Sequence, residues 1–497
     1  MSGVAAMVAA GALPLAGAMA AVVAGRRGGG IAVAVTVGVM AAVLLLVLTV
    51  SRDGPVLVAV GGWEAPLGIM LRADGMAVAF LAMSALVMTA VVALARSQFG
   101  PPEGRRQGES RASFAFWPLA LLLWAALNVV FLSRDLFNLY VGLELLTLAA
   151  VALVAIEGKA ETIAAAMRYM VVALMGSLLY LLGAALAYAA HGTLDILLLS
   201  QRAAAGSTDL VAVSLMTAGL AAKTALFPFH AWLPPAHSGA PAPASAMLSA
   251  LVPKASFYIL MRIWFDATPD LSGAAVLTLL GGLGAIAAIY GSIMALRQAR
   301  LKLIIAYSTV AQLGYLFFVF PLAGGETAAQ PWAAGAWTAA MFHALGHGLA
   351  KAAMFLCAGI WIQAVGHDRL DGMRGLVRVM PMTVFAFALA AITLMGLPPS
   401  AGFTAKYLML TAAFASGQVV WAAVLLAGGL LAAAYLYRPL APAFAREIPE
   451  GLAAVPRWRQ AVPLVLAGAA ILLGIASAPP FDFLQIGRPE AAEEGLE

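Results

Sequence analysis

Apolar residues run through this chain in long blocks with few interruptions. Stretches such as AAVLLLVLTV and LALLLWAALNVV lack the polar and apolar alternation of barrel strands. Backbone polar groups cannot be left unsatisfied in lipid, so such spans must be helices. A spanning helix needs about 20 mostly apolar residues. The pattern therefore predicts an all-α polytopic membrane protein of about 14 transmembrane helices. The predicted spans are 4–24, 31–50, 75–96, 116–133, 136–156, 168–190, 209–228, 244–265, 272–296, 303–323, 332–364, 380–415, 418–440 and 461–478.

The eleventh and twelfth spans are too long for one straight crossing, so each is expected to be tilted, kinked or broken. Proline clashes with the preceding helical turn and lacks a backbone N–H. Pro228 follows Lys223 in the seventh span, and Pro399 precedes Lys406 in the twelfth, so both spans should break beside a lysine. These spans are five apart, and an odd offset between repeats means inverted topology. We therefore expect N-terminal helices 1–3 over 1–115, inverted five-helix repeats over 116–265 and 266–440, and helix 14 with a short tail over 441–497.

Composition supports a membrane protein without a soluble domain. The chain is 63% hydrophobic and 10% charged, with a mean hydropathy of +0.96. Its single cysteine, Cys357, excludes an internal disulfide and a cysteine-rich metal or iron–sulfur site. No nucleotide, flavin or metal motif is present, so we expect no cofactor, and any redox chemistry would belong to partner proteins.

Basic residues are distributed unevenly between the predicted loops. Loops after odd-numbered spans hold 18 Lys and Arg residues, and the opposite side holds 6. In a membrane protein such an excess reports topology rather than nucleic-acid binding. We therefore expect the odd-numbered loops in the cytoplasm, both termini outside, and a location in the cytoplasmic membrane. The minority residues are Arg52, Arg72, Arg134, Arg202, Arg262 and Arg488.

Few ionisable residues lie within the spans, and each is a functional hypothesis by default because burying it is costly. Glu144 is the one acidic residue placed deep in a span, with Tyr140 and Thr147 on its helical face. Lys223 lies beside the predicted break. A broken helix at membrane depth is tolerated where it is buried in protein or lines a wet cavity. The alternative for both residues is a static ion pair that holds two helices together.

Lys254 and a histidine-bearing stripe follow in later spans. Pro253 should bend the helix at Lys254, and Tyr258 and Arg262 continue the same face. A buried lysine loses its charge more readily than an exposed one, so it can accept and release protons. His343, His347 and Lys351 are spaced i, i+4, i+8, so they line one stripe of a helix. Histidine titrates near neutrality and can relay protons.

Two alternatives compete for the stripe. A His-x-x-x-His pair on a helix can bind zinc, but HEXXH is absent and no carboxylate lies nearby in the sequence. The histidines can also bond a neighbouring helix and do nothing further. We expect no metal here.

Four accessory candidates remain beside Tyr258. His230 and His237 flank a proline-rich loop that we expect at the outer membrane edge, either opening a half-channel or capping helices. Tyr307 and Gln312 give the tenth span a polar face, which can pack helices or hold water between proton carriers.

Four blocks of sequence together are specific for one known family. They are FPFHAWLPPAHSGAPAPASAMLSALVPK, AYSTVAQLGYLFF, FHALGHGLAKAAMF and GLPPSAGFTAK. With them the chain resembles the antiporter-like subunits shared by respiratory complex I and Mrp-type cation/proton antiporters, most densely over 136–410. The resemblance implies 14 helices and two inverted repeats. It also implies functional roles for Glu144, Lys223 and Lys254, and for Lys406 as the terminal basic residue.

The resemblance also bears on the branch of the family. One complex I branch has glutamate where this chain has Lys406, and another has a long lateral helix for which this chain ends too soon after span 14. The chain looks most like the D-type subunits of Mrp antiporters, while hydrogenase-linked and bicarbonate-transport relatives stay open. We therefore expect a proton-translocating subunit of a cation/proton antiporter, with sodium as the cation. It would work in the lipid bilayer with other membrane subunits and without nucleic acid. The alternatives are a proton-pumping subunit of a redox complex and a non-transporting scaffold.

Overall fold

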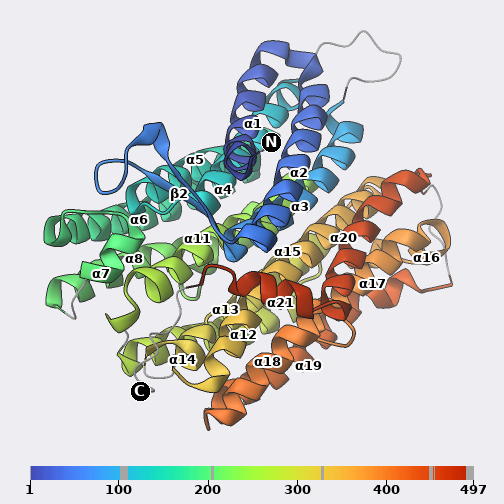
Figure 1. The fold of residues 1–497 in the computed structure, drawn as a ribbon. Helices are drawn as coiled ribbons and strands as arrows, with labels where there is room; N and C mark the ends of the chain where they lie inside the picture. The colour runs from blue at the N-terminus through green and yellow to red at the C-terminus, as the bar shows by residue number, and fades with distance from the viewer. Residues whose placement is uncertain are drawn as a thin grey trace.

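A computed structural model describes residues 2–100, 110–202, 206–271, 273–325, 329–446, 452 and 454–488. Within these residues, eleven helical segments are long and apolar enough to cross a membrane. The first segment, Gly3–Asp53, contains two helices that pack side by side, α1 (Gly3–Ala24) and α2 (Gly28–Asp53). Shorter helices complete two further crossings, the broken seventh and twelfth. The all-α polytopic fold is thereby confirmed, with every predicted span occupied by helix (Figure 1).

The remaining elements follow the order of the predicted spans. The longer helices are α3 (Gly75–Phe99), α4 (Arg111–Leu132), α5 (Leu136–Ala155), α6 (Ala160–His191), α8 (Ser207–Lys223), α10 (Ala242–Ala250), α11 (Val252–Met261), α12 (Ala274–Leu296), α13 (Leu301–Leu316), α15 (Pro331–Val365), α17 (Pro381–Met395), α18 (Ala401–Ala415), α19 (Val419–Ala443) and α20 (Arg457–Ile475). The short helices are α7 (Ile196–Arg202), α9 (Leu233–Gly239), α14 (Val319–Ala323), α16 (Leu376–Val379) and α21 (Ala478–Gln485).

Polar caps fix where several helices begin. The first N–H groups of a helix have no partner inside it, and a Ser or Asp side chain just before the helix can accept from one of them. Asp74 accepts from the Ala77 N–H at the start of α3, and Asp135 accepts from the Asn138 N–H at the start of α5. Ser400 does the same for α18, directly after the break in the twelfth span.

The loops between the helices lie on two opposite faces of the molecule, and loops on the same face contact one another. On one face Arg300 pairs with Asp368, and Arg438 donates to the Leu296 and Gln298 carbonyls. We call this face, which carries the loops rich in Lys and Arg, the basic-rich face. On the basic-poor face, isolated backbone β-bridges join Leu71 to Ser133 and Asp135 to Asp195. The Gly75 N–H donates to the Ile486 carbonyl on the same face. The two ends of the described chain, near Gly3 and Arg488, both lie on the basic-poor face.

Both predicted helix breaks are confirmed. Helix α8 ends at Lys223, and the chain turns through Pro228 before α9 begins. Helix α17 ends at Met395, where Gly396 has φ +82°, a conformation that favours glycine. The eighth crossing also bends as predicted, because α10 ends at Ala250 and α11 begins at Val252.

Helix α15 is continuous over 35 residues. At 1.5 Å per residue it is about 52 Å long, against a hydrocarbon core of about 30 Å. The eleventh span is therefore unbroken, and it must tilt or project beyond the hydrocarbon core. It runs between the two halves of the molecule and packs against α3, α10, α13, α17, α18 and α20 (Figure 1).

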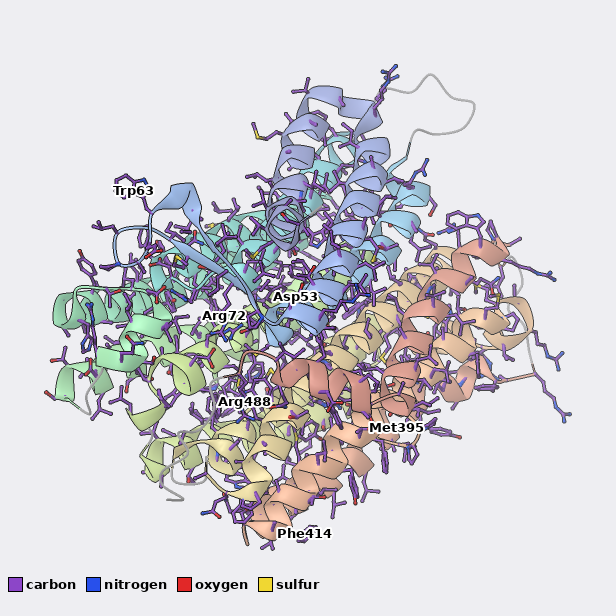
Figure 2. The ribbon with its side chains drawn as sticks, viewed as in Figure 1. Asp53, Trp63, Arg72, Met395, Phe414 and Arg488 are labelled. Atoms are coloured by element: carbon purple, nitrogen blue, oxygen red, sulfur yellow. The ribbon has the colours of Figure 1, made fainter. Side chains whose placement is uncertain are left out.

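The basic-poor face carries structure that the apolar pattern does not predict. An antiparallel hairpin of β1 (Val56–Ala59) and β2 (Met70–Ala73) joins α2 to α3. Helix α21 lies across the ends of α3 and α15, with Gln485 bonded to Thr338 and Phe481 packed against Phe342. Large apolar side chains such as Trp63 and Phe414 project from the surface (Figure 2).

Candidate functional site

The structure brings Glu144 of α5 and Lys223 of α8 together. The Lys223 Nζ lies 3.3 Å from Glu144 Oε1 and 2.9 Å from Thr147 Oγ1. The Ser177 hydroxyl of α6 donates to the same glutamate oxygen. The Lys223 side chain is 5% exposed and that of Glu144 is 21% exposed. The pair is therefore buried on the lysine side and open on the glutamate side.

Close contact between α6 and α8 positions two members of this group. Gly176 precedes Ser177 on α6, and Gly219 lies one turn before Lys223 on α8. A Cβ added to Gly176 would lie 2.7 Å from the Gly219 carbonyl oxygen, so only glycine allows the two backbones to approach this closely.

Lys254 lies in the molecule's centre and is fully buried. Its Nζ donates to the Ser249 carbonyl across the bend between α10 and α11, at 2.6 Å. The Ser249 and Thr309 hydroxyls are 2.8 Å apart, which links this bend to α13. No side-chain hydrogen bond among the described residues joins Lys254 to Lys223.

The predicted stripe on α15 faces α13. Lys351 donates to the Ile305 carbonyl at 2.9 Å and to the Ser308 hydroxyl. The His343 ring contacts the Gln312 carbonyl at 3.2 Å and stacks on His347, with ring centroids 5.8 Å apart. In the part of the chain that the structure describes, no group of three or more His, Cys, Asp or Glu side chains is placed to hold a metal ion.

Lys406 of α18 spans the break in the twelfth crossing with hydrogen bonds to the end of α17. Its Nζ donates to the Leu394 carbonyl at 3.0 Å and the Met395 carbonyl at 3.1 Å, at the end of α17. It also lies 4.7 Å from the centre of the Tyr315 ring, which in turn packs against His343. Tyr315 of α13 therefore contacts both Lys406 and the stripe.

The central lysines differ from Lys223 in what they bind. Among the described residues, Glu144 is the one carboxylate that forms an ion pair with a lysine inside a span. Lys254, Lys351 and Lys406 bind backbone carbonyls and hydroxyls instead. Such partners can accept a hydrogen bond from the ammonium without holding a full opposite charge.

The accessory candidates fall into different places. Gln312 donates to the Leu394 carbonyl and so lies between His343 and Lys406. Tyr307 is half-buried on α13. Tyr258 bonds to Phe131 and to Arg262, toward the basic-poor face.

The expected position of His230 and His237 at the outer edge is wrong. Lys302, at the start of α13, donates to the Ala240 carbonyl just after α9, so this turn lies on the basic-rich face. His237 is fully buried, and neither of its ring nitrogens has a partner among the described residues. The loop lies on this face because the broken seventh crossing continues through α9 toward it.

Sequence reasoning missed Lys302, which it assigned to a loop. The residue is 7% exposed, and its ammonium donates to the Ala240 carbonyl just after α9. It directly precedes the predicted tenth span, so its sequence position alone could not separate a surface residue from one that α9 covers.

The architecture and site define a class: a polytopic helical membrane protein with two broken crossings and a line of buried ionisable side chains. Residues 133–432 match the family described as NADH:quinone oxidoreductase/Mrp antiporter, transmembrane. The chain belongs to this family.

Known relatives come from both branches. The N-type subunit of the NADH-quinone oxidoreductase of Desulforudis audaxviator is 36% identical over 86% of this chain and 84% of its own length. The D-type subunit of the Na(+)/H(+) antiporter of Alkalihalophilus pseudofirmus is 29% identical over 90% of this chain and 88% of its own. A chain of the Mrp complex from Dietzia sp. superposes with a TM-score of 0.84 at 25% identity, covering 99% of this chain and 98% of that one.

Proposed function

We propose that the chain is the proton-translocating subunit of a multi-subunit cation/proton antiporter, with sodium as the exchanged cation. The observation that carries the proposal is the set of buried lysines and histidines in the broken and central crossings. A scaffold has no need of buried lysines at Lys223, Lys254, Lys351 and Lys406, because each buried charge is costly. The partners would be further membrane subunits, as in the Mrp complex that this chain resembles.

The proposed path has three steps. Lys223 changes protonation as Glu144 approaches or withdraws, since a carboxylate within about 4–6 Å favours the charged lysine. Lys254 then passes the proton to the stripe of Lys351, His347 and His343, with the hydroxyls of α13 between them. Lys406 controls release at the far end.

A membrane subunit of a proton-pumping redox complex is the second candidate. The 36% identity to the N-type subunit of an NADH-quinone oxidoreductase supports it. The buried axis would then serve the same proton movement, driven by electron transfer in partner subunits.

Transport by the intact complex separates these candidates. The complex would be purified from its native membrane through a tag on this chain and reconstituted in liposomes with an imposed pH gradient. We expect added sodium to collapse the gradient and quinone with NADH or ferredoxin to leave it unchanged. A gradient generated by quinone reduction and indifferent to sodium would support the redox candidate. If replacing the buried lysines changes neither the sodium-driven nor the quinone-driven movement of protons, the chain would be a scaffold.

We also propose that the basic-rich face is cytoplasmic and that both termini lie outside the cytoplasmic membrane. The basis is the excess of Lys and Arg on that face. Cysteines introduced singly at positions 60 and 372 would be labelled in intact cells with a reagent that cannot cross the membrane, with Cys357 replaced by alanine. We expect labelling at position 60 and none at 372 until the membrane is opened. The reverse pattern would invert the orientation.

A further inference from the structure

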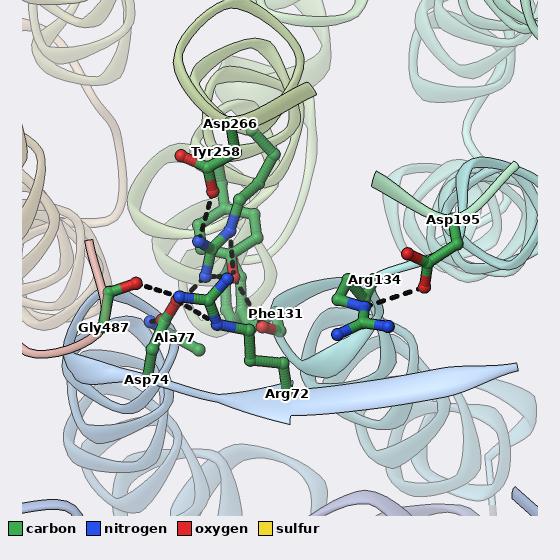
Figure 3. A network of polar contacts seen from close by, with 10 residues as sticks. Arg72, Asp74, Ala77, Phe131, Arg134, Asp195, Tyr258, Asp266 and Gly487 are labelled. Atoms are coloured by element: carbon green, nitrogen blue, oxygen red, sulfur yellow. Dashed lines mark hydrogen bonds and ion pairs between the residues drawn. The ribbon is translucent and has the colours of Figure 1, made fainter. Parts of the chain in front are cut away.

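We propose that Arg262 is a barrier that keeps the proton path at Lys254 closed toward the basic-poor face. The inference rests on the proposed function, because it takes Lys254 to carry protons. It concerns the outer cluster, which consists of Arg72, Asp74, Tyr258, Arg262 and Asp266 (Figure 3).

The outer cluster continues the helix that carries Lys254. Tyr258 lies one turn beyond Lys254 on α11, and Arg262 lies one turn further, where a π-helix over Arg262–Ala267 follows. The eight residues from Lys254 to Arg262 correspond to about 12 Å along the axis. The same face of one helix therefore leads from a buried lysine toward the basic-poor face.

Solvent reaches this cluster from the basic-poor face. Side chains of Arg72, Arg134, Arg262 and Asp266 line a small cavity there. The Arg72 side chain is 17% exposed and that of Asp266 is 9% exposed, whereas Tyr258 and Lys254 are fully buried. The boundary between wet surface and buried path thus falls at Arg262 and Tyr258.

The Tyr258 hydroxyl has no free position for an arriving proton. A phenol has one donor and two acceptor lone pairs. Tyr258 donates to the Phe131 carbonyl at 2.6 Å and accepts from Arg262 Nε at 3.0 Å and Nη2 at 2.8 Å. A proton leaving Lys254 in this direction meets an oxygen whose lone pairs are already used.

Arg262 cannot take up the proton either. A guanidinium is always protonated in proteins and has no acceptor. Its Nη2 lies 2.7 Å from Asp74 and its Nη1 lies 2.6 Å from Asp266, so two carboxylates hold it in place. Asp74 is itself fixed, because it caps α3 and pairs with Arg72. The fixed cation therefore separates Tyr258 from the carboxylates that could accept a proton from the path.

Passive proton leak tests this barrier directly. The complete complex carrying Arg262→Gln would be reconstituted in liposomes, and the decay of an imposed pH gradient would be followed without sodium or substrate. We expect the decay rate to rise several-fold over the wild-type complex. Adding Lys254→Met to Arg262→Gln should return the rate to the wild-type value, because the leak passes through Lys254.

The matched control is Arg134→Gln, which breaks the Arg134–Asp195 pair beside the same cavity but keeps the Arg262 guanidinium in place. It should leave the passive leak unchanged. If Arg262→Gln does not assemble, Arg262→Gln with Asp266→Asn removes one charge of each sign and should leak as well.

Three results would overturn the barrier: an assembled Arg262 variant that does not leak, a leak that persists without Lys254, or an equal leak in Arg134→Gln. Lost sodium-driven transport without any leak would instead make the cluster an exit. If the wild-type complex shows no sodium-driven proton transport, the proposed function is refuted. This assay is separate from the measurement of the passive leak.

Discussion

Glu144→Gln is expected to reduce proton-linked transport to the level of empty vesicles while the complex stays assembled. Glutamine keeps the shape of the side chain and an oxygen that can accept from Ser177, but it removes the charge that faces Lys223. The measurement is the sodium-driven collapse of a pH gradient, beside the subunit composition of the purified complex. If the pair merely holds α5 against α8, glutamine should preserve much of the activity.

Lys223→Arg tests the other side of the same pair. Arginine keeps the positive charge and can still pair with Glu144, yet it does not release a proton at working pH. We expect this variant to assemble and to be inactive. Normal transport by Lys223→Arg would rule out a titrating lysine and leave it an electrostatic role alone.

Lys254→Met is expected to abolish transport and to leave the melting temperature of the complex unchanged or higher. Lys254 is fully buried and binds a backbone carbonyl rather than a carboxylate. Burying an ammonium in this way is costly, and methionine fills the same space without charge. The melting temperature and the transport rate would be measured on the same preparation.

A purely structural lysine would give the opposite result, a lower melting temperature with transport largely kept. Lys159→Met is the control, because Lys159 is 71% exposed and pairs with Glu157 at the surface. Exposed ion pairs contribute about 0–1 kcal/mol, so neither stability nor transport should change appreciably in the control.

The helices were predictable because lipid imposes a simple rule, namely a continuous apolar run for each crossing. The breaks were predictable because proline and glycine act through the local backbone. Helix ends were less certain where polar residues continue a helix beyond the apolar run. Helix α6 begins at Ala160, eight residues before the predicted start, with Glu161 and Arg168 on its exposed surface.

Tertiary contacts between distant residues were beyond the sequence pattern. The pattern placed Arg262 on the face of Lys254, but Asp74 lies 188 residues away, and nothing local connects the two. The course of α9 toward the basic-rich face and the burial of Lys302 likewise depend on packing between segments. The roles of the predicted proton carriers stay predictions until the variants are measured.

The contact between Gly176 and Gly219 has a mechanical consequence. With their backbones touching, α6 and α8 must move as one body, and Ser177 and Lys223 keep a fixed separation. Any change in the distance between Glu144 and Lys223 must then come from α5 or from rotation of one of the two side chains. The Glu144 side chain is the more exposed of the two, so we expect it to move away from Lys223 while α6 and α8 stay together.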